Sequence, residues 1–442
     1  MNITILGCGK SGIGATKLAL SKGYNVRLTE SKDIDKFEKE YELLKSLNVP
    51  CEFGLNSTKY LDKCDLIVSS PGISKDIKFL KEAQKRNIPI ISEIEFAYRH
   101  TSSKIISVTG TNGKTTTTSL INFILNNAGL KSVACGNIGY TLSEAILENS
   151  TDCIFVVETS SYQLDLVTSF APDIAIILNI TPDHQEYHKT MHNYIEAKWK
   201  TSIFQNENNL LILNSDDDTI SKSIYRTDAK IGYFSLNPVS WGIYRKDDGI
   251  YFKTTAEEEF LMFTEQLSLP GIHNLYNSMA AALAARACEV SNEDIRDSLS
   301  KFNGVEHRLE LVRTIHNTKF INDSKATNIN ATWYALSSYS EPLIWIAGGR
   351  AKNNDYSELD VLVEKNVKVI ICIGEEQNNI FNHFCSKIRC IKADNLEEAL
   401  NYSVDLSEEN NIVLFSPACK SFDAYLNYEQ RGEHFKELVN NI

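Results

Sequence analysis

The stretch that decides the fold runs from Lys104 to Leu120 and reads KIISVTGTNGKTTTTSL. It begins with a β-branched apolar run typical of a buried strand, breaks at a glycine turn, and continues as a helix expected to end near Ala128, before Gly129. A strand, a glycine turn and a helix N-terminus form a cradle for phosphate, because backbone N–H groups and the helix dipole favour an anion. The stretch therefore predicts binding of ATP or GTP.

The residues of this turn have the chemistry that a nucleotide needs. The amine of Lys114 can reach a terminal phosphate, and the hydroxyl of Thr115 can hold a magnesium ion. Two residues separate Gly110 from Gly113, where the general P-loop has four. An ordinary turn of glycine and threonine is the alternative. The residues predicted to bind the nucleotide are Gly110, Thr111, Asn112, Gly113, Lys114, Thr115 and Thr116.

Length and composition limit the class of protein. The chain has 442 residues, which suggests about three domains, and its apolar and charged contents of 43% and 23% are typical of globular proteins. A net charge of −12 argues against a nucleic-acid partner. The ten cysteines contain no CxxC pair, which argues against a disulfide framework or a zinc ribbon. No apolar run reaches the roughly 18 residues of a membrane span, and the N-terminus enters a strand at once. We therefore expect a cytoplasmic protein without membrane insertion or signal peptide.

The first segment carries a second glycine-rich turn, GCGKSG, at residues 7–12. We expect a strand over 3–6 before it, a helix to about Lys22 after it, and a second strand over 25–29 that ends near Glu30. This spacing, with an acidic residue about twenty positions on, is the dinucleotide fingerprint, so a NAD-dependent dehydrogenase is one interpretation. The second phosphate loop and the lack of a hydride-transfer constellation weaken it. The glycines could instead hold the diphosphate of a nucleotide-linked substrate.

A metal position is predicted where the strand over 153–157 ends in Glu158. Open α/β sheets build their sites at the carboxyl ends of parallel strands, so this carboxylate would lie beside the phosphates. A helix-capping acid is the alternative reading of Glu158.

Three histidines recur every four residues after the strand expected over 174–178, namely His184, His188 and His192. On one helix they would share a face, as in a zinc site. No acidic partner of the H-E-x-x-H kind is present, and Pro182 indicates the start of a loop. We therefore expect His184 alone to take part in the site and the other two to be solvated.

Further along, the sequence GIHNLYN at residues 271–277 precedes an alanine-rich helix expected over 278–290. Asn274 and Asn277 are three positions apart and could face one cleft, with helix capping as the alternative. The acidic run at 216–218 is interpreted as a solvated loop.

The third segment alternates strands and helices, with strands expected over 320–321, 343–346, 367–373 and 412–415. Polar clusters follow three of these strands, at 322–328, 348–352 and 416–423. The alternation predicts a doubly wound sheet whose strand ends line a small-molecule site.

The chain resembles the Mur ligases, ATP-dependent amide-forming enzymes of cell-wall synthesis, through the motifs TGTNGKTTTT, CGNIG, ETSSYQL, NITPDH, GIHNLYN, EHRLE, NDSKATN, SPACKSFDAY and EQRG. The resemblance spans nearly the whole chain. The turns GCGKSG and Ser70–Gly72 and the EQRG ending look most like the members that join D-glutamate to UDP-N-acetylmuramoyl-L-alanine. The resemblance implies an α/β fold of three domains: a Rossmann-like N-terminal domain (1–95), a central P-loop-type ATP-binding domain (96–304) and a C-terminal Rossmann-like doubly wound domain (305–442).

The resemblance also implies the ligands and the residues that hold them. ATP and Mg²⁺ would serve a reaction through an acyl phosphate, with UDP-N-acetylmuramoyl-L-alanine bound mainly by the first domain and D-glutamate by the third. Besides the loop, ATP would contact Asn274, Asn277, Arg308 and Asp323. The other two substrates would contact Lys10, Ser11, Glu30, Ser70, Pro71, Gly72, Asn137, Lys325, Thr327, Lys352, Ser421 and Phe422. The metal ligands would be Thr115, Glu158, His184 and Lys198.

Lys198 is implied as the family's carbamylated lysine, whose CO₂ adduct turns an ammonium into a carboxylate-like metal ligand. The Glu-Ala-Lys motif counted from His184 selects Lys198, whereas the usual spacing to Ile-Phe selects Lys200. We favour Lys198, and for either residue a surface lysine on an amphipathic helix is the alternative. The catalytic residues expected from the resemblance are Lys114, His184 and Lys198, in a protein expected to be a monomer.

Four other functions stay open as alternatives. Another Mur ligase would differ mainly in its third domain. Folylpolyglutamate synthetase shares the ATP-binding core but has no use for the turn at 7–12. A nucleotide-dependent switch or motor would show no dependence on an amino-acid acceptor, and a dehydrogenase is distinguished by nicotinamide binding.

Overall fold

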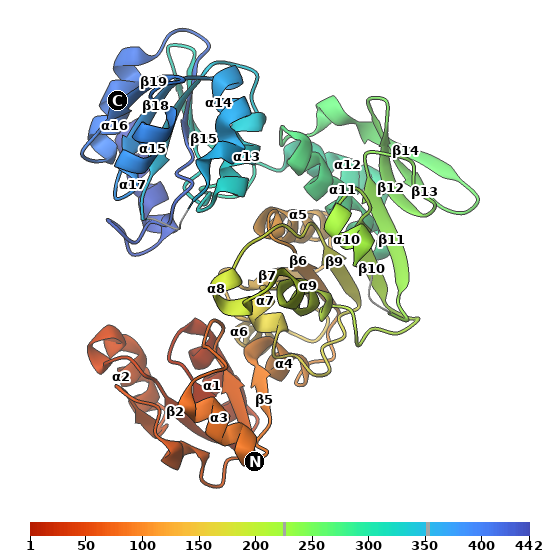
Figure 1. Ribbon diagram of the computed structural model, residues 1–442. Coiled ribbons are helices and arrows are strands. Elements are labelled where there is room, and N and C mark those ends of the chain that lie inside the picture. Colours follow the sequence, from red (N-terminus) through yellow and green to blue (C-terminus); the bar gives the residue numbers. More distant parts are fainter. Residues whose placement is uncertain (224–226, 351–353) are drawn as a thin grey trace. The chain divides into compact units, whose positions relative to one another are not determined.

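The structure, a computed structural model, describes residues 1–223, 227–350 and 354–442, which contain three β-sheets flanked by helices (Figure 1). The chain divides into two compact units, residues 1–267 with 276–302 and residues 268–275 with 303–442. The first unit contains the N-terminal and central sheets, and the second contains the C-terminal sheet. Among the described residues, no helix combines the length and the apolarity that a membrane span requires.

The N-terminal sheet is parallel and has the order β3-β2-β1-β4-β5. Its strands are β1 Asn2–Leu6, β2 Asn25–Thr29, β3 Cys51–Glu52, β4 Leu66–Ser69 and β5 Ile90–Ser92, and its helices are α1 Lys10–Ser21, α2 Glu38–Ser46, α3 Lys78–Lys85 and α4 Glu93–Tyr98. The glycine turn at 7–12 follows β1, and the turn at 70–72 follows β4. Because β1 and β4 are neighbours at the point where the strand order reverses, both turns lie where such sheets bind ligands.

The central sheet has the order β14-β13-β12-β11-β10-β9-β6-β8-β7. Its strands are β6 Ile105–Thr109, β7 Ser132–Gly136, β8 Ile154–Glu158, β9 Ile174–Ile177, β10 Leu210–Asn214, β11 Lys230–Ser235, β12 Gly242–Lys246, β13 Gly249–Lys253 and β14 Glu258–Phe263. Its helices are α5 Lys114–Asn127, α6 Leu142–Glu148, α7 Ser161–Leu164, α8 Gln185–His188, α9 Met191–Trp199, α10 Asp218–Lys222, α11 Ile272–Ala287 and α12 Asn292–Lys301. The strand β6 lies between β8 and β9, so the loop after it borders the ends of both neighbours. The antiparallel extension β12–β14 was not predicted from the sequence.

Helix α5 forms where the sequence predicts it because its apolar residues recur on one side. Leu120, Ile121, Ile124 and Leu125 are all buried, as a helix facing a sheet requires. Gly129 follows the helix with a φ of +80°, a conformation that glycine adopts without strain.

One buried cluster contains residues of both sheets of the first unit. It includes Leu18 of α1, Phe96 of α4, Leu142 of α6 and Phe155 of β8. The N-terminal and central sheets of this unit therefore share apolar contacts.

The C-terminal sheet has the order β15-β16-β20-β17-β18-β19, with only β15 antiparallel to its neighbour. Its strands are β15 Glu310–Ile315, β16 Thr318–Asn322, β17 Leu343–Gly348, β18 Val367–Ile373, β19 Arg389–Lys392 and β20 Ile412–Phe415, and its helices are α13 Ile329–Ser337, α14 Asp360–Asn366, α15 Gln377–Phe384, α16 Leu396–Leu406 and α17 Tyr428–Asn440. Two apolar clusters, one with Trp345 and Leu336 and one with Ile346 and Phe435, cover its two faces. The doubly wound sheet is confirmed, although the sequence analysis missed β15 and β19. The strands β16, β20 and β17 are adjacent, so the polar residues after them gather at one edge.

Candidate active site

The phosphate loop, residues Gly110–Thr115, lies between the end of β6 and the first turn of α5. Gly113 has a φ of +83°, and a Cβ atom there would lie 2.3 Å from Asn277 Oδ1. Any other residue would be strained at this position and would displace that amide. Because the first N–H groups of a helix have no partner within the helix, the start of α5 provides donors for an anion.

Two lysines converge on one carbonyl group of the phosphate loop. Lys114 Nζ donates to the carbonyl oxygens of Gly110 and Thr111 at 2.9 and 2.8 Å. Lys198 Nζ donates to the same Gly110 oxygen at 2.7 Å and is almost completely buried. Burial lowers the pKa of Lys198 well below its usual value, and the charge of Lys114 lowers it further. Lys198 can therefore lose its proton and present a neutral amine.

Glu158, at the end of β8, is 2% exposed and accepts hydrogen bonds on both carboxylate oxygens. Thr115 Oγ1 donates to Oε2 at 2.6 Å, and Asn137 Nδ2 donates to Oε1 at 2.9 Å. An acidic oxygen and a hydroxyl oxygen thus meet beside the phosphate loop. Hard oxygen donors of this kind suit Mg²⁺, so these residues fit the ion that the sequence predicts.

His184 lies at the N-terminus of α8 with a left-handed backbone, φ +52°. Its ring centroid is 4.9 Å from that of Tyr162, and its Nε2 lies 3.6 Å from Asp183 Oδ2. A non-glycine residue with positive φ is uncommon and is often found at a functional site. His184 therefore combines an unusual backbone conformation with a partly exposed ring, as expected of a residue that takes part in a site.

The other two histidines lie on short helices, not on one shared face. Helix α8 ends at His188, Lys189 has a φ of +67°, and α9 begins at Met191. His188 is 4% exposed and its Nε2 lies 2.9 Å from Ser161 Oγ, so the expectation that it is solvated is wrong. Burial lowers the pKa of His188 to about 4, which keeps the ring neutral. The side chain of His192 is exposed, as expected.

Lys198 and Lys200 occupy different surroundings. Lys200 Nζ donates to the Asp165 carbonyl oxygen at 2.6 Å, and its side chain is 30% exposed. Lys198 Nζ contacts the phosphate loop and lies 4.6 Å from the centroid of the Tyr194 ring. Of the two candidates for carbamylation, Lys198 is therefore the one beside the predicted metal ligands.

Two residues that the sequence analysis did not select brace the phosphate loop. Asn179 exchanges hydrogen bonds with Asn112, accepting from its N–H group at 2.8 Å and donating to its carbonyl oxygen at 3.0 Å. The Tyr194 hydroxyl lies 3.1 Å from Thr111 Oγ1. Asn179 lies just after β9, the strand next to β6. Its place at the end of a predicted strand could have identified it from the sequence.

The N-terminal turn brings the predicted Glu30 to the glycines. Glu30 is buried, and its Oε2 accepts a hydrogen bond from Cys8 N at 2.9 Å, which holds the turn closed. A Cβ atom at Gly12 would lie 2.0 Å from the Gly7 carbonyl oxygen, so helix α1 approaches β1 closely only because residue 12 is glycine. Lys10 is exposed and Ser11 is half-buried at the start of α1.

The turn Ser70–Gly72 lies beside the glycine turn, since Ser70 Oγ donates to the Gly7 carbonyl oxygen at 3.4 Å. Pro71 is half-buried and Gly72 is exposed. All the residues predicted from these two turns therefore gather at the carboxyl edge of the N-terminal sheet.

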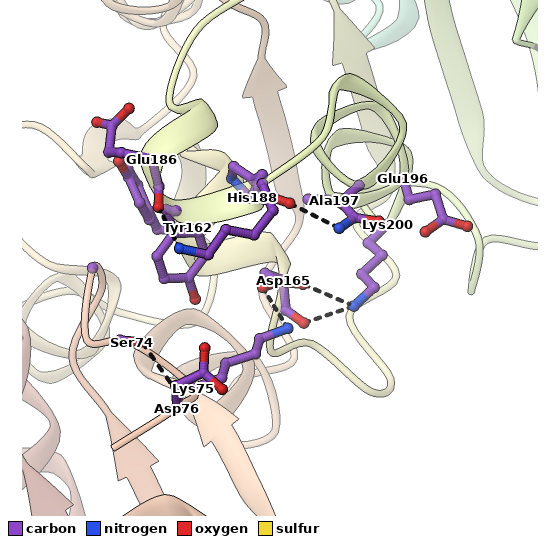
Figure 2. Close-up of a pocket in the computed structure, with 14 residues that line it drawn as sticks. Ser74, Lys75, Asp76, Tyr162, Asp165, Glu186, His188, Glu196, Ala197 and Lys200 are labelled. Atoms are coloured by element: carbon purple, nitrogen blue, oxygen red, sulfur yellow. Dashed lines mark hydrogen bonds and ion pairs between the residues drawn. The ribbon is translucent and has the colours of Figure 1, made fainter.

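A polar cavity of about 730 Å³ continues from this turn toward the central sheet (Figure 2). Its lining comes from residues 72–76 and from the segment that carries α7, α8 and α9. Asp165 lies on its wall between two cations, with Oδ2 at 2.5 Å from Lys75 Nζ and Oδ1 at 3.4 Å from Lys200 Nζ (Figure 2). The cavity thus links the Ser70–Gly72 turn with the helix of Lys198.

Helix α11 begins at Ile272, six residues before the expected start, so Asn274 and Asn277 lie within it. Asn274 Nδ2 donates to the Pro270 carbonyl oxygen at 2.8 Å. Asn277 Oδ1 accepts from Thr117 Oγ1 at 3.2 Å, on the helix of the phosphate loop. The two asparagines belong to different compact units, and each has its own partner.

The acidic run at 216–218 is only in part the solvated loop that the sequence predicts, because an exposed turn at Asp216 leads into helix α10 at Asp218. Asp217 caps α10 by accepting from Ile220 N at 2.9 Å. Asp216 and Asp218 are exposed and Asp217 is half-buried, and Asp216 Oδ1 accepts from Ser235 Oγ at 2.7 Å. The carboxylates of Asp216 and Asp217 both accept hydrogen bonds, the first from Ser235 of β11 and the second from the first turn of α10.

In the second unit, Asp323 follows β16 and is 1% exposed. Its Oδ2 accepts from Ser416 Oγ at 2.8 Å and its Oδ1 from Leu309 N at 3.3 Å. Burial raises the pKa of Asp323 to about 6, while the charge of the half-buried Arg308 acts in the opposite direction. Arg308 and Asp323, both predicted to contact ATP, therefore lie within electrostatic reach of each other.

The residues predicted for D-glutamate follow the adjacent strands β16 and β20. Lys325 Nζ lies 5.0 Å from the Tyr428 ring centroid. Thr327 is half-buried, Ser421 is buried and Phe422 is 54% exposed. Lys352 lies outside the described residues.

Arg431, which the sequence analysis did not select, is buried in α17 and joins the segments after β16 and β20. Its guanidinium donates to Ser324 Oγ at 3.0 Å, the Ser324 carbonyl oxygen at 2.7 Å and the Cys419 carbonyl oxygen at 3.1 Å. Burial lowers the pKa of Arg431 to about 10, so it stays charged at neutral pH. The EQRG motif contained this arginine, but only the fold shows what it contacts.

Three family descriptions match successive parts of the chain. Residues 1–92 match the Mur ligase MurD-like N-terminal domain, residues 108–285 the Mur ligase middle domain, and residues 307–419 the Mur ligase glutamate ligase domain. Together they follow the three sheets and confirm the predicted three-domain α/β fold.

Curated relatives match along the whole chain. A UDP-N-acetylmuramoylalanine–D-glutamate ligase of Salinibacter ruber is 38% identical, over 99% of this chain and 97% of the relative. One of Bacteroides fragilis is also 38% identical, over 100% of this chain and 99% of the relative.

Solved structures share the fold at lower identity. The UDP-N-acetylmuramate–alanine ligase MurC of Thermotoga maritima has a TM-score of 0.61 at 18% identity, over 100% of this chain and 99% of that one. The MurF ligase of the same organism, solved in complex with ADP, has a TM-score of 0.61 at 16% identity, over 96% and 97% of the two chains. At this identity the likeness concerns the fold alone.

Proposed function

The chain belongs to the Mur ligase family, and on this premise we propose that it uses ATP to join the amino group of D-glutamate to the carboxyl group of UDP-N-acetylmuramoyl-L-alanine. Relatives named for this activity align with the chain from end to end at 38% identity. The structural observation that carries the proposal is the phosphate loop with the Thr115–Glu158 pair and the buried Lys198 beside it. Such an enzyme supplies a precursor of peptidoglycan, and we place it in the cytoplasm as a monomer.

The reaction must first activate a carboxylate, which is a poor electrophile at neutral pH. The substrate carboxylate takes the γ-phosphoryl group of ATP, which gives an acyl phosphate and ADP. The amine of D-glutamate then attacks the acyl carbon, phosphate leaves, and the amine loses a proton as the amide forms. In the first step two anions must approach each other, so cations have to offset their repulsion.

Lys114 supplies one of these cations. Its ammonium group is bonded to two loop carbonyl oxygens, and we expect phosphate oxygens to take their place when the nucleotide binds. The N–H groups at the start of α5 then hold the remaining phosphate oxygens, without any rearrangement of the helix. Asn137, whose amide already orients Glu158, stands near the position proposed for the acyl centre.

The metal ligands proposed here are Thr115, Glu158, His184 and a carbamate on Lys198. The Mg²⁺ ion would neutralise charge between the phosphate oxygens and the substrate carboxylate. The buried position of Glu158 and its hydrogen bond from Thr115 support this assignment, because they bring a carboxylate oxygen and a hydroxyl oxygen, both suitable Mg²⁺ ligands, together beside the phosphate loop.

The carbamate requires a neutral amine. The Lys198 nitrogen attacks the carbon of CO₂, a new N–C bond forms, and one proton passes to solvent. The lowered pKa of Lys198 favours the amine that reacts, and the resulting anion has the Lys114 charge nearby. Lys200, partly exposed and bound to Asp165, lacks these conditions.

Within the C-terminal unit, Asn274, Arg308 and Asp323 are proposed to contact ATP. Lys325, Thr327, Ser421 and Phe422 are proposed to hold D-glutamate. The N-terminal turns would bind the uridine nucleotide. With these roles we assign the three domains to residues 1–95, 96–304 and 305–442.

The proposal is tested by measuring ADP formation with UDP-N-acetylmuramoyl-L-alanine and a panel of amino acids. We expect ADP with D-glutamate and none above background with L-glutamate, L-alanine or diaminopimelate, or when the uridine substrate is omitted. ATP hydrolysis that does not depend on the amino acid would refute a ligase. ADP formation with L-alanine or a diamino acid in place of D-glutamate would move the chain to another branch of the family.

A further inference from the structure

Asn322 is the last residue of β16 and stands directly before Asp323. Its side chain is fully buried, between Glu310 of β15 and Phe415 of β20, the residues with which it pairs in the sheet. A buried amide is unfavourable unless its donors and its acceptor have partners. A polar residue at this point of a strand therefore calls for a specific role.

The amide group of Asn322 connects three segments of the second unit, namely the end of β16, the stretch 307–310 and helix α17. Its Nδ2 lies 2.9 Å from His307 Nδ1, 3.0 Å from Glu310 Oε2 and 3.2 Å from the Gly432 carbonyl oxygen. Its Oδ1 accepts from Ser324 N at 3.2 Å. Since an NH₂ group has two hydrogens for these three acceptors, all of its donor capacity is used. We call Asn322, His307, Glu310 and Gly432 the amide network.

The bond from Asn322 also involves one particular nitrogen of the His307 ring. Because an amide nitrogen can only donate, Nδ1 is the acceptor wherever this bond forms, and the other ring nitrogen, Nε2, faces Glu433 Oε1 at 3.6 Å. The ring packs so tightly on α17 that a Cβ atom at Gly432 would lie 2.2 Å from Nδ1. The helix and the histidine can approach this closely only because residue 432 is glycine.

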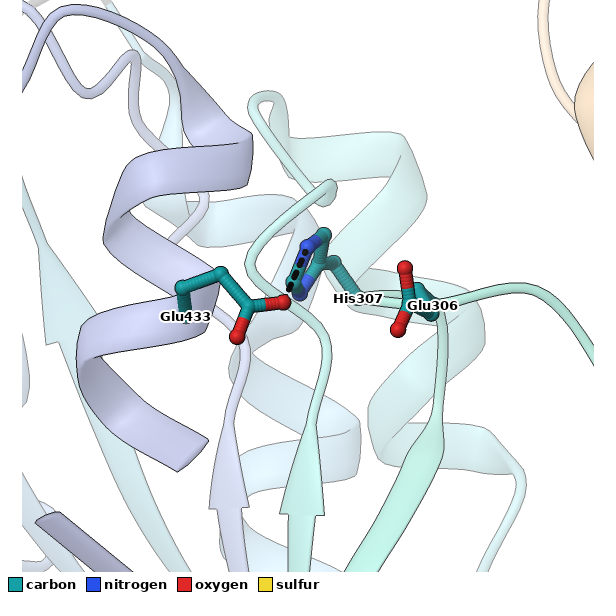
Figure 3. Close-up of side chains that lie close together, drawn as sticks. All are labelled: Glu306, His307 and Glu433. Atoms are coloured by element: carbon teal, nitrogen blue, oxygen red, sulfur yellow. Dashed lines mark ion pairs between the residues drawn. The ribbon is translucent and has the colours of Figure 1, made fainter. Parts of the chain in front are cut away.

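A metal site is the other reading of this region, because one ligand atom each of Glu306, His307 and Glu433 lie within 4.8 Å of one another (Figure 3). However, Lys436 Nζ lies 3.0, 3.1 and 3.2 Å from carboxylate oxygens of Glu306, Glu310 and Glu433. Burial disfavours the charge of Lys436, but these hydrogen bonds outweigh it and raise its pKa. One ammonium group thus already contacts all three acids and offsets part of their charge, and we interpret the cluster as a scaffold.

The scaffold fixes the backbone on both sides of Arg308. His307 and Leu309 have left-handed conformations, with φ of +62° and +46°, which bulky residues keep only when the surroundings hold them. His307 N donates to Glu310 Oε2 at 2.8 Å, and Leu309 N donates to Asp323 Oδ1 at 3.3 Å. The direction in which Arg308 leaves the chain therefore depends on the amide network.

We propose that Asn322 is a positioning residue for ATP, acting through Arg308 and Asp323. This inference rests on the proposed function, since it takes those two side chains as contacts of the nucleotide. Asn322 touches no substrate itself. It holds the turn that carries Arg308 and is bonded to the segment that carries Asp323, so its loss loosens both contacts at once.

The test compares ATP kinetics of the full-length ligase with those of Asn322→Ala and Asn322→Asp. Asn322→Ala leaves buried acceptors without a donor, and we expect the KM for ATP to rise about tenfold while kcat changes less than about threefold. Asn322→Asp keeps the shape but removes both N–H donors and adds a carboxylate beside Glu310. We expect it to raise the KM for ATP at least as much.

Asn411→Ala is the matched control. Asn411 is a buried asparagine of the same sheet at the opposite end, just before β20, where its Oδ1 accepts from Glu408 N at 3.0 Å. We expect this variant to lower the melting temperature without changing the KM for ATP. If neither Asn322 variant folds, Gly432→Ala displaces the His307 ring from the side of α17, and its KM for ATP should rise as well.

A KM for ATP within about twofold of wild type in folded Asn322→Ala would overturn the proposal. Wild-type kinetics in Asn322→Asp would also overturn the proposal, because the shape of the side chain would then be enough without its N–H donors. An equal rise of the KM for ATP in Asn411→Ala would overturn it too. Failure of the proposed function is seen separately, since the wild-type enzyme would then form no ADP in response to D-glutamate.

Discussion

The phosphate loop and the amide network both stand at the carboxyl end of a parallel strand, but they are built differently. The loop is one run of consecutive residues, and its shape comes from the positive φ angles of its own glycines, Gly110 and Gly113. The network draws on three distant stretches, around His307, Asn322 and Gly432, and its shape comes from hydrogen bonds between them. A local motif can be recognised in a sequence, whereas a dispersed network becomes visible only when the chain has folded.

The largest effect is expected in the loop, from Lys114→Ala. Removing the cation that faces the phosphates should lower the rate of ADP formation on the order of 10³-fold. The melting temperature should change little, because the partly buried hydrogen bonds that Lys114 Nζ donates to two loop carbonyl oxygens are the ones that we expect phosphate oxygens to replace. Lys131→Ala, an exposed lysine paired with Asp152 just after α5, is the control and should retain wild-type activity. Near-normal turnover in Lys114→Ala would mean that the loop does not serve phosphoryl transfer.

The second prediction concerns the lysine that touches the loop from a distant helix. Lys198→Ala should lose activity on the order of 10²-fold, and short carboxylic acids should restore part of it by replacing the carbamate. Lys200→Ala should neither lose as much nor respond to these acids, because its amine binds Asp165 instead. If short carboxylic acids restored activity only in Lys200→Ala, the carbamate would have to be assigned to Lys200 instead of Lys198.

The third prediction concerns the buried carboxyl group of Asp323, which we expect to lower the free energy of unfolding at high pH. Burial raises the pKa of Asp323 from 3.8 to about 6, so the folded state binds this proton more tightly than the unfolded chain does. The contribution of Asp323 to stability is therefore complete below about pH 4 and declines as the pH rises through 6. Asn has no such charge, so Asp323→Asn should be more stable than wild type at pH 8, by roughly 1–3 kcal/mol, and not at pH 4.

The measurement is denaturant unfolding at both pH values, together with the KM for ATP, which should rise. Asp218→Asn, at an exposed aspartate, is the control and should show no such pH dependence. Equal stability differences at pH 4 and pH 8 would show that the buried carboxyl does not titrate in this range.

The smallest effect is expected at the rim of the amide network, from Glu433→Gln. Glu433 is half-exposed, and Lys436 keeps its bonds to Glu306 and Glu310, so the loss should stay below about 1 kcal/mol in urea unfolding. Any rise in melting temperature on adding Mg²⁺ or Zn²⁺ should be the same in the wild-type protein and in Glu433→Gln, because the ammonium of Lys436 already contacts the acids of this cluster. A metal-dependent increase that Glu433→Gln abolishes would establish a metal site there.

Much of the fold was predictable because the spacing of apolar residues and the turn residues between them mark many of the strands and helices in the sequence. The strands β1, β6, β8 and β20 are short apolar runs that end in glycine or polar turns, and the helix α5 ends at its glycine. The strands β12–β14 and β15 were missed because they are antiparallel with one face toward solvent, so polar residues interrupt their apolar pattern.

The candidate site was predictable to the extent that its residues belong to motifs. Lys114 and Thr115 were selected from the glycine loop and Glu158 from its place at a strand end, and in the fold Thr115 Oγ1 donates to Glu158 Oε2. His188 was misjudged, because no pattern shows that a polar residue in a loop segment will be buried against Ser161. The roles proposed for these residues stay predictions until the variants are measured.

The sequence by itself determined the phosphate loop, since glycine at two positions and a lysine at the helix start act through local backbone geometry. It also determined the alternation of strands and helices in the N-terminal segment, in the segment around the phosphate loop and in most of the C-terminal segment, through the spacing of apolar residues. Only the tertiary structure decided which lysine lies by the loop, which histidine is buried, and that Asn322 joins three segments. Those features depend on contacts between residues far apart in the chain, and burial, which sets their protonation and their partners, exists only in the folded state.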